Sequence, residues 1–154
     1  MRQATISPQV AARIVAPLAQ ALRHLRKAHS VAHAVAPPDV LARMERVWRA
    51  TTSTKAMLLA IWEAYPELAR RDGPDDLQSW ELDKSSWQWA KAWQWGRATR
   101  ECILKALEEA SSSIEVAAAA VAGTEPADAR RFHRELANAL WLVRIARRAI
   151  EARR

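Results

Sequence analysis

Apolar residues recur at helical spacing along most of this chain, and this periodicity constrains the fold more than any other feature. From Asp128 onward the steps are three, four or seven residues, at Phe132, Leu136, Leu140, Val143 and Ile150. Such steps place side chains on one face of an α-helix. The whole chain has only three glycines among 154 residues, which leaves few turn formers. We therefore expect an all-α fold, a single-domain antiparallel bundle of five or six helices over residues 1–154.

Helix boundaries in the first third are marked by proline. Ser7 followed by Pro8 is typical of an N-cap and first helical position. Pro17 predicts a kink or a short break inside this first helix, and Pro37 with Pro38 predicts its end. The next helix then begins at residue 38 or 39.

This second element is predicted to have a core side that includes Val47 and Trp48. The polar run 51–54 follows, with sequence Thr-Thr-Ser-Thr, and offers several possible caps. We expect a hinge there, before another helix that continues to about residue 68.

A long helix is predicted to begin at Ser85 or Ser86, after an acidic loop over residues 72–84. Its core line is expected at Ala92, Gly96, Thr99, Ile103, Ala106, Ala110, Ile114, Ala117 and Val121. The triple serine 111–113, followed by Glu115, resembles a capping box that would split this helix in two.

Charge is unevenly distributed, with basic ends and an acidic middle. Residues 1–49 carry eight Lys or Arg against two Asp or Glu, and residues 127–154 carry eight against three. Residues 50–126 carry eight against twelve, within a net charge of +7. A positive charge of this size informs the choice of partner more than the fold.

The face opposite the apolar side of the last helix gathers arginine around one tryptophan. At about 100° per residue it collects Arg130, Arg134, Trp141, Arg144 and Arg148. Guanidinium groups suit phosphate contacts, and an indole among them suits stacking on a base. The pattern predicts a nucleic-acid contact. The alternative is a solvated face, because Glu135 and Glu151 could pair with Arg131, Arg147 or Arg148.

Four tryptophans lie within nine residues, at Trp87, Trp89, Trp93 and Trp95. They do not share one helical face. A central helix packed on several sides could bury them, or they could form an interface with another subunit or a second copy, where tryptophan is enriched. A base-stacking platform is a third alternative. We predict a partner interface, because four rings are hard to bury around two turns of a small bundle.

Metal and cofactor chemistry have little support in the sequence. His29 and His33 are four residues apart, a spacing that can chelate a metal, but no HExxH or ExxH pattern accompanies them. We favour polar histidines near a helix C-terminus, where they suit the helix dipole. We expect no metal and no cofactor.

One enzyme resemblance exists. Arg23, His24 and His29 resemble the arginine–polar–spacer–histidine motif of helical ribonucleases of the higher-eukaryote-and-prokaryote nucleotide-binding type. That resemblance would imply RNA cleavage across a dimer. No phosphate loop, nucleophile elbow or Cys/His dyad accompanies it. We expect a non-catalytic protein, with a ribonuclease as an alternative.

The layout also resembles the small helical subunit of type III and type IV CRISPR effector complexes. Residues 51–54 resemble a helix-opening Thr-Thr-Ser motif, and 87–100, with Trp95-Gly96-Arg97, resemble a middle helix with an aromatic–Ala–Gly–Arg ending. Residues 131–148, opening on Arg131-Phe132, resemble the terminal helix. The resemblance implies a non-catalytic ribonucleoprotein subunit in antiviral defence that helps hold RNA or an RNA–DNA duplex. It also implies that Arg130, Arg134, Arg144 and Arg148 contact the backbone, and that the tryptophans pack against other subunits.

The compartment is predicted from cysteine and hydropathy. A single cysteine, Cys102, excludes an internal disulfide and fits a reducing cytosol. No apolar run reaches the length of a membrane span, so we expect a cytoplasmic protein without membrane contact.

Overall fold

Helices account for the secondary structure of the part of the chain that the structure, a computed structural model, describes: residues 6–69, 94–122 and 127–152. They are α1 (Pro8–Val35), α2 (Pro38–Arg43), α3 (Glu45–Ala64), α4 (Pro66–Ala69), α7 (Arg97–Val121) and α8 (Ala127–Ala152). No strand occurs within these ranges, which confirms the predicted all-α class. None of these helices combines the length and apolarity that a membrane crossing requires.

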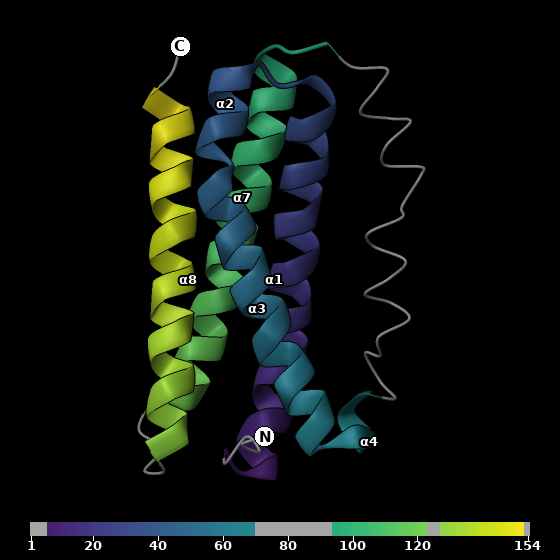
Figure 1. The fold of residues 1–154 in the computed structure, drawn as a ribbon, viewed down its shortest axis with the longest axis vertical. Coiled ribbons are helices and arrows are strands. Elements are labelled where there is room, and N and C mark those ends of the chain that lie inside the picture. The colour runs from purple at the N-terminus through teal and green to yellow at the C-terminus, as the bar shows by residue number, and fades with distance from the viewer. Residues whose placement is uncertain (1–5, 70–93, 123–126, 153–154) are drawn as a thin grey trace.

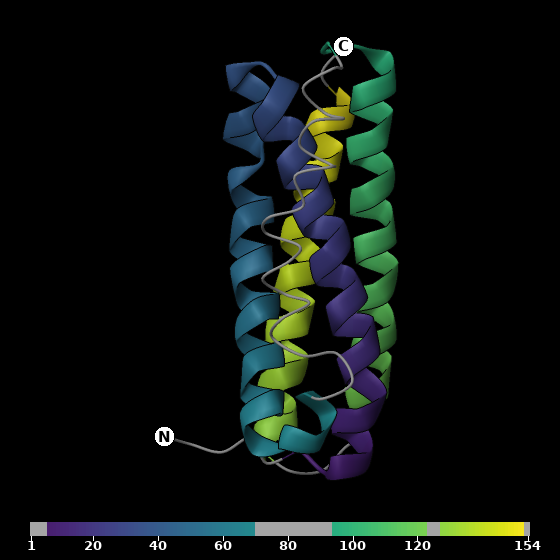
Figure 2. The same ribbon diagram turned by 90° about the vertical axis from the view of Figure 1, so that its right-hand side faces the viewer.

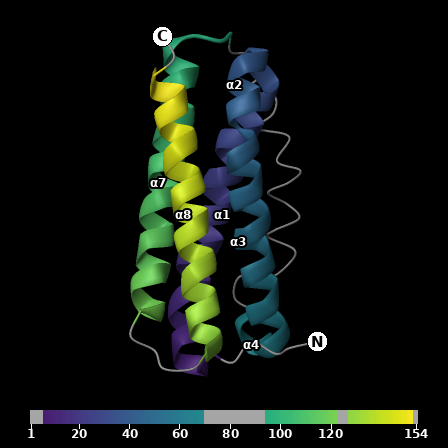
Figure 3. The same cartoon turned by 60° about the vertical axis from the view of Figure 1, so that its left-hand side comes forward.

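The four long helices lie side by side, as Figures 1 and 2 show. The colour gradient in Figure 1 runs upward along α1 and α8 and downward along α3 and α7. Both α7 and α3 pack against α1 and α8, so α8 lies between α7 and α3 with α1 behind it (Figure 3). The short α2 connects α1 to α3 at one end of the molecule.

The first helix begins and ends where proline predicts. The Val10 N–H donates to Ser7 Oγ at 3.2 Å, and Pro8 occupies the first turn. The helix ends at Val35, ahead of Pro37. Pro17 lies inside α1 without ending it, so a break there is wrong. Burial of the flanking turns on the other helices stabilises this segment against the roughly 3 kcal/mol that an interior proline costs.

The predicted hinge at residues 51–54 is wrong, because the whole run lies inside α3. Thr51 Oγ1 donates to the Val47 carbonyl, and Thr54 Oγ1 donates to the Ala50 carbonyl, each at 2.8 Å. These bonds to the preceding turn satisfy hydroxyls that are buried within the helix. The chain instead breaks about two turns earlier, at Met44, between α2 and α3.

The predicted split of the long helix at residues 111–113 is also wrong. α7 is continuous, and Ser111 Oγ donates to the Leu107 carbonyl at 2.9 Å. Gly96 is the N-cap of α7 and is exposed, whereas Thr99 and the positions after it on the predicted core line are buried. The expected start at Ser85 or Ser86, and Ala92, lie outside the described residues.

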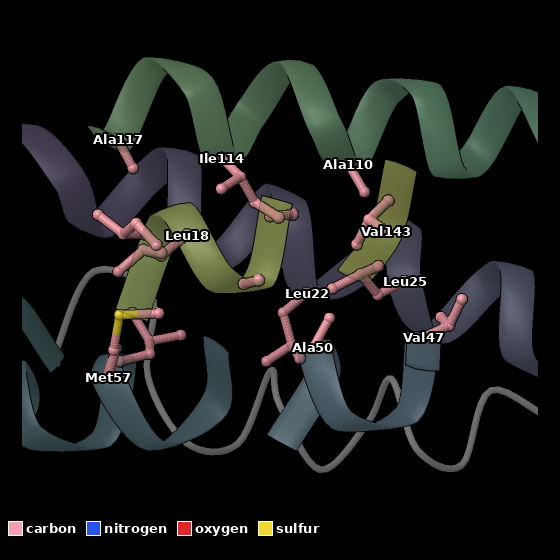
Figure 4. Close-up of a cluster of buried hydrophobic side chains, with 14 of the residues drawn as sticks. Leu18, Leu22, Leu25, Val47, Ala50, Met57, Ala110, Ile114, Ala117 and Val143 are labelled. Atoms are coloured by element: carbon pink, nitrogen blue, oxygen red, sulfur yellow. The ribbon is translucent and has the colours of Figure 1, made fainter. Parts of the chain in front are cut away.

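One apolar core is shared by the four long helices (Figure 4). The labelled residues are Leu18, Leu22 and Leu25 of α1, Val47, Ala50 and Met57 of α3, Ala110, Ile114 and Ala117 of α7, and Val143 of α8. All of them are buried, most of them completely. Because every long helix contributes one stripe to this core, the outward face of each is fixed.

Two neighbouring positions on α7 test this division between core and surface. Ile114→Ala should lower the free energy of unfolding by about 2 to 5 kcal/mol, because Ile114 is fully buried and truncation leaves a cavity. Val116→Ala removes an exposed side chain and should change it by less than about 0.5 kcal/mol. Urea unfolding followed by circular dichroism measures both, and equal losses would contradict this packing.

Candidate nucleic-acid interface

The last helix presents its arginines away from the core. Phe132, Leu136, Val143 and Ile150 are buried, and Leu140 is partly buried at the edge of the same stripe. On the opposite face Arg130, Arg134, Trp141, Arg144 and Arg148 are all exposed. Trp141 leaves 57% of its surface in solvent, although it is an aromatic side chain. The five residues predicted as a site therefore share one outward face of α8.

Carboxylates neutralise the edges of this face. Arg131 pairs with Glu135 at 3.5 Å, as the four-residue spacing predicts. Arg147 binds Glu151 at 3.0 Å and also lies 3.7 Å from Glu108 of α7.

Arg144 is neutralised by a residue that the sequence did not indicate. Its Nη2 donates to Glu115 of α7, which lies 29 residues away along the chain. Helical spacing identifies partners within one helix only, so this contact between helices required the fold. Both side chains remain about half exposed, at 50% each.

The centre line of the face, which carries Arg130, Arg134 and Arg148 along the length of α8, retains positive charge without a carboxylate partner among the described residues. Within the described part of the chain, Arg130, Arg134 and Arg148 form no ion pair. With a rise of about 1.5 Å per residue, the outer two lie roughly 27 Å apart along α8, and Trp141 lies between them. This arrangement can contact several anionic groups in a row while presenting one aromatic ring.

The tryptophans predicted as a partner interface fall mostly outside the described residues. This applies to Trp87, Trp89 and Trp93. Trp95 precedes α7, is half-buried and packs against the core cluster. The predicted role of the four as an interface stays a prediction.

The histidines of α1 contact two different helices. His24 Nδ1 lies 3.1 Å from Glu109 Oε2 of α7, whereas the His29 ring lies 5.1 Å from the Trp48 ring of α3. His29 also stacks on His33 at 6.0 Å. Among the residues that the structure describes, no group of three or more potential metal ligands occurs.

Burial controls the charge of both contacting imidazoles. It lowers the pKa of His29 below its ordinary value, and the nearby His33 and Arg26 lower this pKa further. Burial also lowers the pKa of His24, and this effect outweighs the opposing attraction of Glu109. Both rings therefore favour the neutral form near pH 7.

A surface groove lies between α3 and α8, and the sequence did not indicate it. It has a volume of about 520 Å³ and is lined by Trp48, Arg49, Thr52, Ser53 and Ala56 of α3 and Glu135 of α8. The expectation that Trp48 belongs to the core is wrong, because 51% of its surface is exposed. Within α3 (Glu45–Ala64), Val47 is fully buried in the core. The next residue, Trp48, lies about 100° further around the helix and remains exposed.

No family model, curated protein or solved structure matches this chain at a significant level. Functional inference therefore rests on the residues and their geometry.

The contact between His29 and Trp48 generates a test of this region. An NMR titration should give a pKa for His29 below the ordinary histidine value, and Trp48→Ala should raise it by removing part of its cover. Trp141→Ala is the matched control, since Trp141 projects from α8 into solvent. An unchanged His29 pKa in the Trp48 variant would contradict the packing described here.

Proposed function

We propose that this protein binds the sugar–phosphate backbone of nucleic acid through the outward face of α8, as a non-catalytic subunit with little sequence preference. One observation carries the proposal. Arg130, Arg134 and Arg148 are exposed and form no ion pair within the described residues, and an exposed indole lies among them. Guanidinium groups bind phosphate oxygens with planar, charge-assisted hydrogen bonds.

The distribution of carboxylates favours this function over a merely solvated face. Solvated surfaces generally intersperse charges of both signs. Here Glu135 and Glu151 are engaged by Arg131 and Arg147, at the edges of the face. No carboxylate of the described residues pairs with Arg130, Arg134 or Arg148, although Arg144 on the same face pairs with Glu115. The segment 127–154 has a strong excess of basic residues. The centre is therefore available to an external polyanion.

Arg144 can contact a phosphate only when its ion pair with Glu115 opens. Its ion pair with Glu115 is half exposed on both sides. An exposed pair of this kind contributes only about 0 to 1 kcal/mol, so a phosphate can compete for the guanidinium.

The wider setting follows from the resemblance to CRISPR effector small subunits and is proposed with it. We propose RNA or an RNA–DNA duplex as the nucleic acid, and other subunits or a second copy as the partner of the tryptophan cluster 87–95. Independently of that resemblance, we propose a cytoplasmic location from the single cysteine and the lack of a long apolar run. Helical periodicity is the basis for proposing a single domain over residues 1–154, an antiparallel bundle of five or six helices. The ribonuclease alternative stays a prediction, with Arg23, His24 and His29 all on α1.

Charge removal from the centre of the face should weaken nucleic-acid binding. The triple variant Arg130→Gln, Arg134→Gln, Arg148→Gln should lose about tenfold or more in affinity at low salt. It should also lower the slope of log affinity against log salt by roughly 2 to 3, since each phosphate contact contributes about 0.7 to 0.9. Fluorescence anisotropy of a labelled oligonucleotide across a salt series measures both quantities.

A matched control removes the same charge elsewhere. Arg13→Gln, Lys27→Gln, Lys105→Gln changes three exposed cations of α1 and α7. This variant should keep most of the affinity and of the salt slope. Equal losses in the two triple variants would show that net charge, and not the face of α8, binds the nucleic acid.

A further inference from the structure

The groove between α3 and α8 has the size and lining of a site for one planar group. It is shallow and widely open to solvent, with a volume of about 520 Å³. The indole of Trp48 contributes the aromatic surface. Thr52, Ser53 and Ala56 have short side chains, which leave the adjacent surface of α3 open.

Trp48 is held in place before anything binds. Its ring lies 5.1 Å from the ring of His29, which is itself partly buried on α1. Half of the indole surface nevertheless remains in solvent and contributes to the groove. An aromatic ring fixed on one side and open on the other loses little conformational freedom when a second ring stacks on it.

Polar groups of the groove match the edge of a nucleobase. The Thr52 hydroxyl donates to the Trp48 carbonyl at 3.0 Å, so its lone pairs remain acceptors. Glu135 reaches the groove from α8, and its 3.5 Å contact with Arg131 leaves carboxylate lone pairs unused. A carboxylate accepts hydrogen bonds from the exocyclic amino group of a base, and uracil and thymine lack that group.

The groove and the arginines lie on adjacent faces of α8, and the groove is on the side of α3. Arg134 directly precedes Glu135 in α8, and Arg131 pairs with Glu135. On the opposite side of α8, Glu108 and Glu115 of α7 contact Arg147 and Arg144. A strand that follows the arginines of α8 therefore passes beside the groove, which Glu135 of the same helix lines on the side of α3.

We propose that this groove binds one amino-bearing nucleobase, stacked on Trp48, from a single strand whose phosphates lie on the arginines of α8. This inference rests on the proposed function and narrows its ligand to a single strand. A base in a duplex is stacked between its neighbours and offers no free face to an indole. Adenine, cytosine and guanine carry the amino group that the Glu135 carboxylate can accept from, and uracil does not.

Two groove variants test the proposal, one by filling the space and one by removing the aromatic surface. Ala56→Phe adds a ring at an exposed position of α3, which keeps the core and the charge unchanged. Trp48→Ala removes the stacking surface. Ala119→Phe makes the same alanine-to-phenylalanine change at an exposed position of α7 and serves as the control.

The probes are labelled oligo(A) and oligo(U) of twelve or so nucleotides, and a duplex RNA of the same length. Wild type and Ala119→Phe should bind oligo(A) more tightly than oligo(U). Both groove variants should lose about tenfold in affinity for oligo(A), because base–aromatic stacking is a large part of single-strand binding. Their affinity for the duplex should stay within about twofold of wild type.

The results separate this inference from the proposed function. If Ala56→Phe binds oligo(A) as wild type does, the groove does not hold a base, and the inference is wrong. The proposed function then still stands if the arginine triple variant loses affinity for both single strand and duplex. If that triple variant binds both as wild type does, α8 is not the backbone contact, and the proposed function fails whatever the groove variants show.

Discussion

Burial of the apolar stripe of α8 against α3 and α7 is the constraint on which the functional surface depends. Phe132, Leu136, Val143 and Ile150 repeat at helical spacing and are all buried. A rotation of α8 about its axis would expose them, at a cost of roughly 1.5 to 3 kcal/mol for each large side chain. The arginines opposite this stripe are therefore held toward solvent by apolar packing, with no need for a contact of their own.

The same packing determines which arginines are neutralised. Because α7 lies on one side of α8, Glu115 and Glu108 reach Arg144 and Arg147. On the side of α3, Glu135 pairs with Arg131 within its own helix. Arg130, Arg134 and Arg148 project away from both neighbouring helices and have no carboxylate partner among the described residues. An uncompensated row along the outer line of α8 thus follows from the position of the helix in the bundle, together with the exposed Trp141.

Sequence alone predicted the features that depend on local periodicity and chain breakers. The all-α class, the start of α1 at Ser7 and Pro8, and the stripes of α7 and α8 follow from residues a few positions apart. The two interruptions predicted at 51–54 and 111–113 were wrong. A serine or threonine hydroxyl can cap the start of a new helix, or it can donate to the carbonyl of the preceding turn inside a continuous helix. Thr51, Thr54 and Ser111 bond back to the preceding turn. Sequence cannot distinguish these outcomes, since tertiary burial of the segment decides between them.

Contacts between helices were beyond sequence reasoning for a different reason. The pairing of Arg144 with Glu115, the packing of His29 on Trp48 and the groove at α3 all join residues distant in the chain. Only the relative placement of α1, α3, α7 and α8 brings them together. The helix break at Met44 was also beyond sequence reasoning, because no glycine or proline marks that boundary.

Phosphate binding by the arginines of α8 can be observed at the arginine side chains themselves. An NMR titration of the guanidinium Nε–Hε signals with a short single-stranded RNA reports which of them bind phosphate. We predict large shifts for Arg130, Arg134 and Arg148, and little change for Arg97, which is paired with Glu101 on the neighbouring α7. Shifts confined to arginines outside α8, with these three unchanged, would contradict it.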